Sequence, residues 1–310
     1  MRTVLVTGLF ALTLAAQTPA PPKPAAPPPP AQPSFASPEE AINAMGDAAE
    51  RNDTATMLKL LGPGGKELVQ PAGDPGAKED RANFAKMLHE KLNLEKDPTN
   101  PNRVTFAVGS EDWPFPVPLV RDKRGKWYFD TEAGSMEVLA RHIGRDELNA
   151  IEVCRGYVEA QLAYADLDRD ADGILEYAQK VVSSPGKHDG LYWEDEPGNL
   201  VPKSFAAAAE AAAQGGKKPE PYHGYYYRIL KAQGSAAEGG AVRYVVKGEM
   251  IGGFALVAWP AEYGVTGVKT FIVNHKGVVY EKDLGPTTTA LAHQMTTFNP
   301  DKTWHVVDKE

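Results

Sequence analysis

Apolar residues recur at helical spacing through the first part of the folded chain. The run Ser37-Pro38-Glu39-Glu40 combines a capping serine, a proline in the first turn and acids at the positive helix end, and apolar positions then follow to Ala49. Shorter repeats predict a second helix that stops at Gly62 and a third over residues 79–94. Strands are predicted over three segments, 103–108, 116–121 and 126–130, the last two joined by a turn at Gly125.

A much longer helical repeat opens the second half, over residues 135–167, with Gly144 and Gly156 inside it. An alanine-rich helix is expected over residues 204–214. The remaining pattern predicts strands at 222–230, 243–246, 253–259, 268–274 and 278–283. A short helix is predicted at 287–295 and a last strand at 301–306. The sequence therefore predicts an α+β fold: N-terminal helices with a small antiparallel sheet, then a long helix packed on an antiparallel meander.

The first residues have the pattern of an export signal. Residues 1–16 have a cationic start, an uncharged apolar run shorter than the roughly 20 residues of a membrane span, and a small-residue exit. Residues 17–34 form a linker rich in proline and alanine, typical of polyproline II. We expect cleavage after Ala15 or Ala16, a periplasmic or secreted product with no transmembrane span, and two domains at 35–132 and 133–310.

Charge and cysteine content narrow the possible functions. With 33 basic and 41 acidic residues the chain carries a formal charge of −8, which gives it no general attraction for nucleic acid. The single cysteine, Cys154, excludes an intrachain disulfide and a four-cysteine zinc site. The sequence also lacks an HExxH, GxSxG, Walker or Rossmann motif. No specific reaction follows from it, and a non-catalytic role is favoured.

An acidic run after the long helix is a candidate calcium loop. Asp168, Asp170 and Asp172 fit positions one, three and five of such a loop. Gly173 then falls at the sharp turn, Ile174 would supply a backbone carbonyl ligand, and Glu176 falls at position nine. Position twelve is Gln179, so the usual bidentate glutamate is missing. The alternative is a solvated acidic turn. A calcium site predicts a higher melting temperature with millimolar calcium, which a chelator reverses.

An aromatic segment is the second candidate site. Tyr225 and Tyr227 share one face of the predicted strand, Tyr222 and His223 precede it, and Trp193 lies in an aromatic and acidic loop. These residues could bind a sugar or a peptide. The alternative is a tyrosine-rich sheet face packed against the long helix, with its hydroxyls reaching water.

Several long segments resemble a bacterial exported family known as domain of unknown function 2950. The resemblance covers Phe35 to Trp304 and rests on residues 143–148, 168–178, 184–187, 189–193, 222–228 and 252–285. It implies no activity.

Two weaker resemblances concern architecture. The long helix with strands 254–260, 270–273 and 277–280 resembles the globular heads of type IV pilins and pseudopilins, although charged residues on the helix argue against filament assembly. The element order of the first half resembles the cones related to nuclear transport factor 2, which implies a pocket between sheet and helices with residues 112–115 at its rim.

Three functions remain open. The first is an exported, non-catalytic binding or assembly module of the cell envelope, possessing a calcium-stabilised loop and binding an envelope protein or polysaccharide. The second is an envelope polymer hydrolase that uses carboxylates or His223 near Tyr225–Tyr227. The third is a small-ligand binder that uses the pocket of the first domain.

Overall fold

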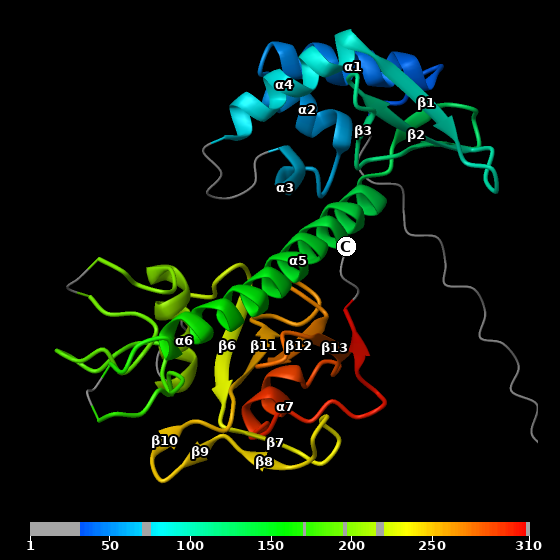
Figure 1. The fold of residues 1–310 in the computed structure, drawn as a ribbon. Coiled ribbons are helices and arrows are strands. Elements are labelled where there is room, and N and C mark those ends of the chain that lie inside the picture. The colour runs from blue at the N-terminus through cyan, green and yellow to red at the C-terminus, as the bar shows by residue number, and fades with distance from the viewer. Residues whose placement is uncertain (1–31, 70–75, 170–171, 195–196, 215–219, 308–310) are drawn as a thin grey trace, which may run out of the picture.

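The chain folds into two bodies joined by one helix (Figure 1). The computed structural model describes residues 32–69, 76–169, 172–194, 197–214 and 220–307. Buried apolar side chains form two separate clusters, one within residues 41–129 and the other within residues 150–298. Helix α5 (Thr131–Ala165) runs from the first body to the second.

The first body packs four helices against a small antiparallel sheet. Its elements are α1 (Pro38–Glu50), α2 (Thr54–Leu61), α3 (Lys66–Val69), α4 (Ala77–Glu90), β1 (Leu92–Lys96), β2 (Arg103–Val108), β3 (Trp113–Pro114), β4 (Leu119–Arg121) and β5 (Trp127–Phe129). The strand order is β1-β2-β4-β5, with β3 also paired to β2. Alternation along β2 places Val104, Phe106 and Val108 in the core.

The predicted third helix is four residues too long. It ends at Glu90, and residues Leu92–Lys96 form strand β1 along the whole length of β2. Leu92 lies four residues after Leu88 and so continued the helical pattern of α4, but in the structure residues 92–96 pair their backbone with residues 104–108 of β2. Tertiary pairing outweighs the local pattern here.

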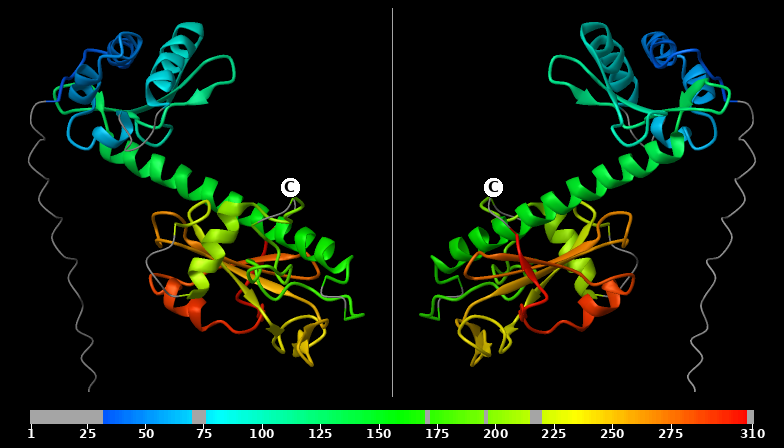
Figure 2. Two further views of the ribbon diagram at one scale, coloured as in Figure 1. Left: turned by 90° about the vertical axis from the view of Figure 1, so that its left-hand side faces the viewer. Right: turned by 90° about the vertical axis from the view of Figure 1, so that its right-hand side faces the viewer.

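The second body is an antiparallel meander with helices on both faces (Figure 2). Its sheet has the order β14-β13-β12-β11-β6. Helix α5 contacts β11, β12 and β13 on one face, α6 lies against β6, and α7 contacts β11. The elements are α6 (Lys203–Gln214), β6 (Tyr225–Leu230), β11 (Ala255–Pro260), β12 (Lys269–Asn274), β13 (Val279–Asp283), α7 (Thr288–Gln294) and β14 (His305–Val306).

Two short hairpin-like ladders lie between β6 and β11. They pair β7 (Ala232–Gln233) with β8 (Val242–Arg243), and β9 (Val245–Val246) with β10 (Glu249–Met250). The predicted strand 243–246 is therefore split, because Tyr244 turns its ring into the core and donates its hydroxyl to Gln233. The α+β class and the long helix on an antiparallel meander are confirmed.

Helix α5 is more exposed in its first half than its apolar pattern predicts. Its first turn packs on the first body, where Gly134 leaves room for Val117. Met136, Val138 and Leu139 are exposed, and the helix becomes buried on one side only from Asp146 onward. The apolar stripe thus extends beyond the sheet that it covers. Among the described helices, none has the length and apolar character that a membrane crossing requires.

Candidate functional site

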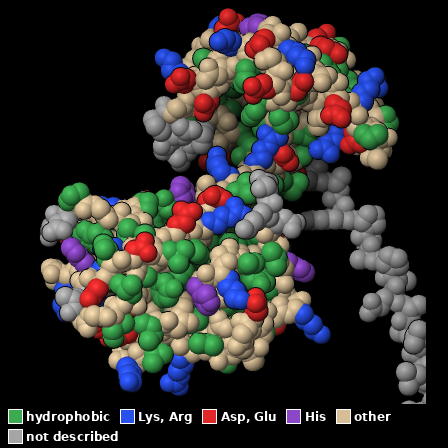
Figure 3. All heavy atoms as spheres, in the orientation of Figure 1, with side chains coloured by type: hydrophobic (Ala, Val, Ile, Leu, Met, Phe, Trp, Pro, Cys, Tyr) green, Lys and Arg blue, Asp and Glu red, His purple; other side chains and the backbone are tan. Residues whose placement is uncertain are grey.

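The first body encloses an apolar cavity of about 800 Å³. Residues of α1, α2, α3 and α4 form one side of it, the segment 113–117 forms the other, and Val138 reaches it from α5. Hydrophobic side chains gather in the hollow of the upper body on the side facing the lower one (Figure 3). A cavity of this size can hold a drug-sized molecule.

Three methionines and three aromatic residues contribute to the cavity lining. Met45, Met57 and Met87 contribute flexible thioethers, which adapt to irregular shapes. Phe115 is the centre of an aromatic cluster, with its ring centroid 4.7 Å from that of Phe106 and 5.0 Å from that of Phe84. Of the predicted rim 112–115, Trp113 and Phe115 line the cavity.

The charged residues of the cavity lie at its outer edge. Asp80 and Lys86 are exposed, and the Arg81 guanidinium is held in place, with Nε donating to Asn52 at 2.9 Å and one terminal nitrogen donating to the Val69 carbonyl at 2.8 Å. The described lining contains no histidine, cysteine, serine or threonine. The described lining thus combines an apolar interior, which suits an apolar group, with charged side chains at its edge.

The acidic run is a tight turn whose described carboxylates bond to nearby backbone. Asp168 accepts from Gly173 N at 2.9 Å, Asp172 from Ile174 N at 2.7 Å, and Glu176 from Met250 N on β10 at 3.1 Å. Asp170 lies outside the described residues. The described part of the chain holds no cluster of three acidic, histidine or cysteine side chains arranged for a metal. The calcium loop stays a prediction.

Tyr225 and Tyr227 are core residues, so the prediction that they form an accessible aromatic row is wrong. Both rings are fully buried beneath α5 and α6, and their hydroxyls donate to the carbonyls of Lys269 and Tyr222. Burial raises the pKa of Tyr227 well above its ordinary value. The face of the strand that carries these two rings is buried, whereas Tyr226 and Arg228 on the other face are half-buried.

Trp193 is also buried, and it does not lie on the tyrosine face. The Arg169 guanidinium lies 5.4 Å from the centroid of the Trp193 ring, and the centroid of the His188 ring lies 4.7 Å from it. Arg169 lies at the same time 4.8 Å from the Tyr164 ring, which ties this loop to the end of α5. Trp193 acts as packing between loop and helix.

Tyr222 and His223 remain accessible at a tight two-residue turn. Tyr222 N and Tyr225 N donate to each other's carbonyls, and His223 and Gly224 have φ of 49° and 73°. The side chains of Tyr222 and His223 line a second cavity of about 500 Å³, which lies between this turn, α5 and the start of α6. Of the five predicted ligand-binding residues, these two stay candidates.

A buried acid, Asp146, was missed as a site residue. It is 7% exposed on the inner side of α5, and His142 Nε2 lies 3.2 Å from its Oδ2. One terminal nitrogen of Arg145 lies 3.0 Å from His142 Nδ1, on the other side of the same ring. The signal was present in the sequence: a carboxylate among the inward positions of an apolar helical repeat.

Burial raises the pKa of Asp146 above its ordinary value, although attraction to His142, Arg145 and His223 acts in the opposite direction. The backbone of the turn lies so close to the Asp146 carboxylate that any side chain at Gly224 would collide with it. Asp146 therefore lies enclosed between its own helix and the Tyr222–Tyr225 turn.

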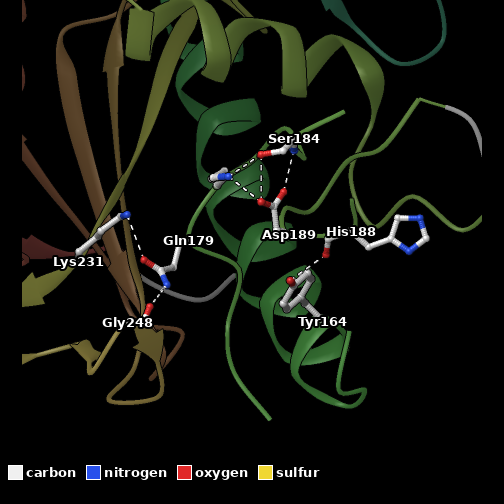
Figure 4. A network of polar contacts seen from close by, with 8 residues as sticks. Tyr164, Gln179, Ser184, His188, Asp189, Lys231 and Gly248 are labelled. Atoms are coloured by element: carbon white, nitrogen blue, oxygen red, sulfur yellow. Dashed lines mark hydrogen bonds and ion pairs between the residues drawn. The ribbon is translucent and has the colours of Figure 1, made fainter. Parts of the chain in front are cut away.

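A serine, a lysine and an aspartate meet in the loop after the acidic run (Figure 4). Lys180 Nζ donates to Ser184 Oγ and to Asp189 Oδ2, both at 2.7 Å, and Ser184 N donates to Asp189 Oδ1. Although burial opposes it, the hydrogen bonds from Lys180 and Ser184 lower the pKa of Asp189. These contacts tie Lys180, Ser184 and Asp189 together and close the loop.

Comparison with known proteins gives a family and no function. No curated protein matches the chain, and no solved structure matches it, so the likeness to pilin heads and to nuclear transport factor 2 cones stays a prediction. A family described as "Protein of unknown function (DUF2950)" matches residues 32–307, which is most of the chain and both bodies. This chain is a member of the DUF2950 family.

Proposed function

We propose that this protein is an exported binding module that holds an apolar ligand in the cavity of its first body. The observation that carries the proposal is the 800 Å³ space lined by methionine, aromatic and aliphatic side chains. Cavities of this kind are the usual place where small molecules bind in proteins. The ligand class that fits is an acyl chain or an apolar group of similar size.

The lining favours binding over catalysis. Asn83 and charged residues at the edge supply its polar atoms, and the deep residues Met45, Leu61 and Phe84 are apolar. An apolar ligand gains about 25 cal/mol for each Å² that it removes from water. Flexible thioethers let one cavity accept several ligand shapes, which suits a carrier or sensor.

Export is the second part of the proposal and rests on residues 1–34, most of which lie outside the described residues. The cationic start, apolar run and small-residue exit are typical of a cleaved signal. The mass of the protein from its native host checks this: we expect a chain that begins just after Ala15 or Ala16. An intact Met1 on a cytoplasmic protein would contradict export.

Substituting Val138 tests the cavity without disturbing the core. Val138 lines the cavity and is 38% exposed, whereas Leu139 is 39% exposed and does not line it. We expect Val138→Trp to weaken binding of decanoate at least about tenfold by calorimetry, because the indole occupies the cavity mouth, a change of about 1.4 kcal/mol.

The matched control is Leu139→Trp, which places the same ring on the next residue of the same helix. It should bind decanoate as the wild type does. Equal binding by both variants, or no binding by the wild type, would contradict an apolar site at this position.

A further inference from the structure

A second cavity in the lower body has a different character from the apolar one. Its floor is helix α5, and its walls are the segment Leu200–Phe205 and the Tyr222–His223 turn. It is separate from the apolar cavity, since the two share no residue. We call it the α5 groove.

Gly156 keeps the α5 groove open. It lies in the middle of α5, where glycine is less favourable than other residues, and a Cβ at this position would meet nothing within 4 Å. It is exposed and lines the groove, together with Val153 and Ala160 one turn away on either side. Any larger side chain at position 156 would project into the space.

His223 supports a ligand role for the groove. Its φ of 49° is a left-handed conformation that side chains other than glycine adopt at a cost, although histidine tolerates it better than most. Its neighbour in the turn, Gly224, is the residue type that such turns favour at both central positions. The conformation places the exposed His223 ring beside Tyr222, with centroids 4.2 Å apart, at the edge of the groove.

The polar atoms of the groove suit a neutral ligand. Along α5 the edge carries the Asn149 amide and two carboxylates, Glu152 and Glu159, and Glu152 is paired with Arg155. Because Glu152 is paired with Arg155, Glu159 supplies most of the remaining formal charge of the edge. Amide, carboxylate and imidazole groups hydrogen-bond hydroxyls, while the half-buried Tyr222 ring can cover a C–H face. The Phe205 ring lies in the core behind it.

We propose that the α5 groove binds a neutral carbohydrate of two or three sugar units. The groove offers what such a ligand needs: about 500 Å³ of space, the Tyr222 and His223 rings on one wall, and hydrogen-bonding side chains along α5. The site is independent of the apolar cavity, so one protein would hold an apolar ligand and a sugar at once.

A pair of glycine substitutions tests the sugar site. Gly156 and Gly144 both lie in α5 and both have open space at the Cβ position, but only Gly156 lines the groove. We expect maltotriose or tri-N-acetylchitotriose at millimolar concentration to bind the wild type and Gly144→Leu, as measured by calorimetry. Gly156→Leu should lose about tenfold or more in affinity. Decanoate binding should be unchanged in both variants, which separates this result from the apolar site.

A second variant keeps the turn and removes the ring. His223→Gly should fold with a higher melting temperature, because glycine relieves the left-handed conformation, and should bind the trisaccharide several-fold more weakly. Failure of both trisaccharides to bind the wild type overturns the proposal. So does unchanged sugar binding by Gly156→Leu, or binding of a lysine-rich peptide in place of the sugars that depends on Glu159.

Discussion

Replacing Gln161 by leucine should lower the free energy of unfolding by about 3 kcal/mol, because a buried donor and a buried acceptor lose their partners together. Gln161 is fully buried in α5, and its Nε2 donates to the Ala178 carbonyl at 2.9 Å. Its Oε1 accepts from Ala178 N at 2.8 Å. This amide therefore pairs both backbone groups of Ala178 and holds the segment after the acidic run against the helix. Urea denaturation followed by circular dichroism measures the loss.

The comparison variant is Tyr157→Phe, which removes one hydrogen-bond partner of the same amide. Gln161 Nε2 donates to Tyr157 Oη at 2.8 Å but keeps the Ala178 carbonyl when that hydroxyl is absent. We expect a loss of about 1 kcal/mol. A loss for Gln161→Leu no greater than that for Tyr157→Phe would mean that the backbone at Ala178 is not fixed on α5 by this amide.

Replacing Asp146 by asparagine should raise the free energy of unfolding at neutral pH by about 1 kcal/mol, because it removes a buried charge. Single stabilising substitutions commonly have effects of this size. Burial raises the pKa of Asp146, so the folded state disfavours its charge. Asparagine keeps the shape without the charge. Thermal unfolding at several pH values measures the difference from the wild type.

The pH dependence follows from the direction of that pKa shift. Since the folded state binds the Asp146 proton more tightly than the unfolded state, the wild type gains stability as the pH falls through the raised pKa. The advantage of Asp146→Asn is therefore full at neutral pH and vanishes below the ordinary pKa of 3.8. Asp47→Asn, on the exposed side of α1, is the control and should show no such trend. Destabilisation by Asp146→Asn at neutral pH would show that the pairing with His142 outweighs the burial.

Most of the helices and long strands could be predicted from local pattern. The Ser37 cap, the alternation of residues 103–108 and the turn at residues 274–277 each depend on neighbours in the chain, and each appears in the structure. Strand β1 could not be predicted, because the edge of β2 decides it. The two-residue strands β3, β7 and β10 were not predicted, since they depend on tertiary pairing, whereas β14 lies within the strand predicted at 301–306.

The sites were harder to predict than the fold. The sequence allowed Tyr225 and Tyr227 to form either a binding face or a packed core face, and the positions of α5 and α6 decide for the core. The apolar cavity joins residues as distant as Met45 and Val138, which no spacing rule connects. Gly156 was visible as a weak point of a helix, but its role depends on what lies opposite.

The most direct test of the apolar site uses the methionines as reporters. Met45, Met57 and Met87 line the cavity, whereas Met250 and Met295 belong to the second body. In a protein labelled with carbon-13 at its methionine methyl groups, decanoate should shift the resonances of the three cavity methionines and leave Met250 and Met295 in place. Unchanged resonances of all three cavity methionines at saturating decanoate, or equal shifts in both bodies, would contradict a ligand site in the first body.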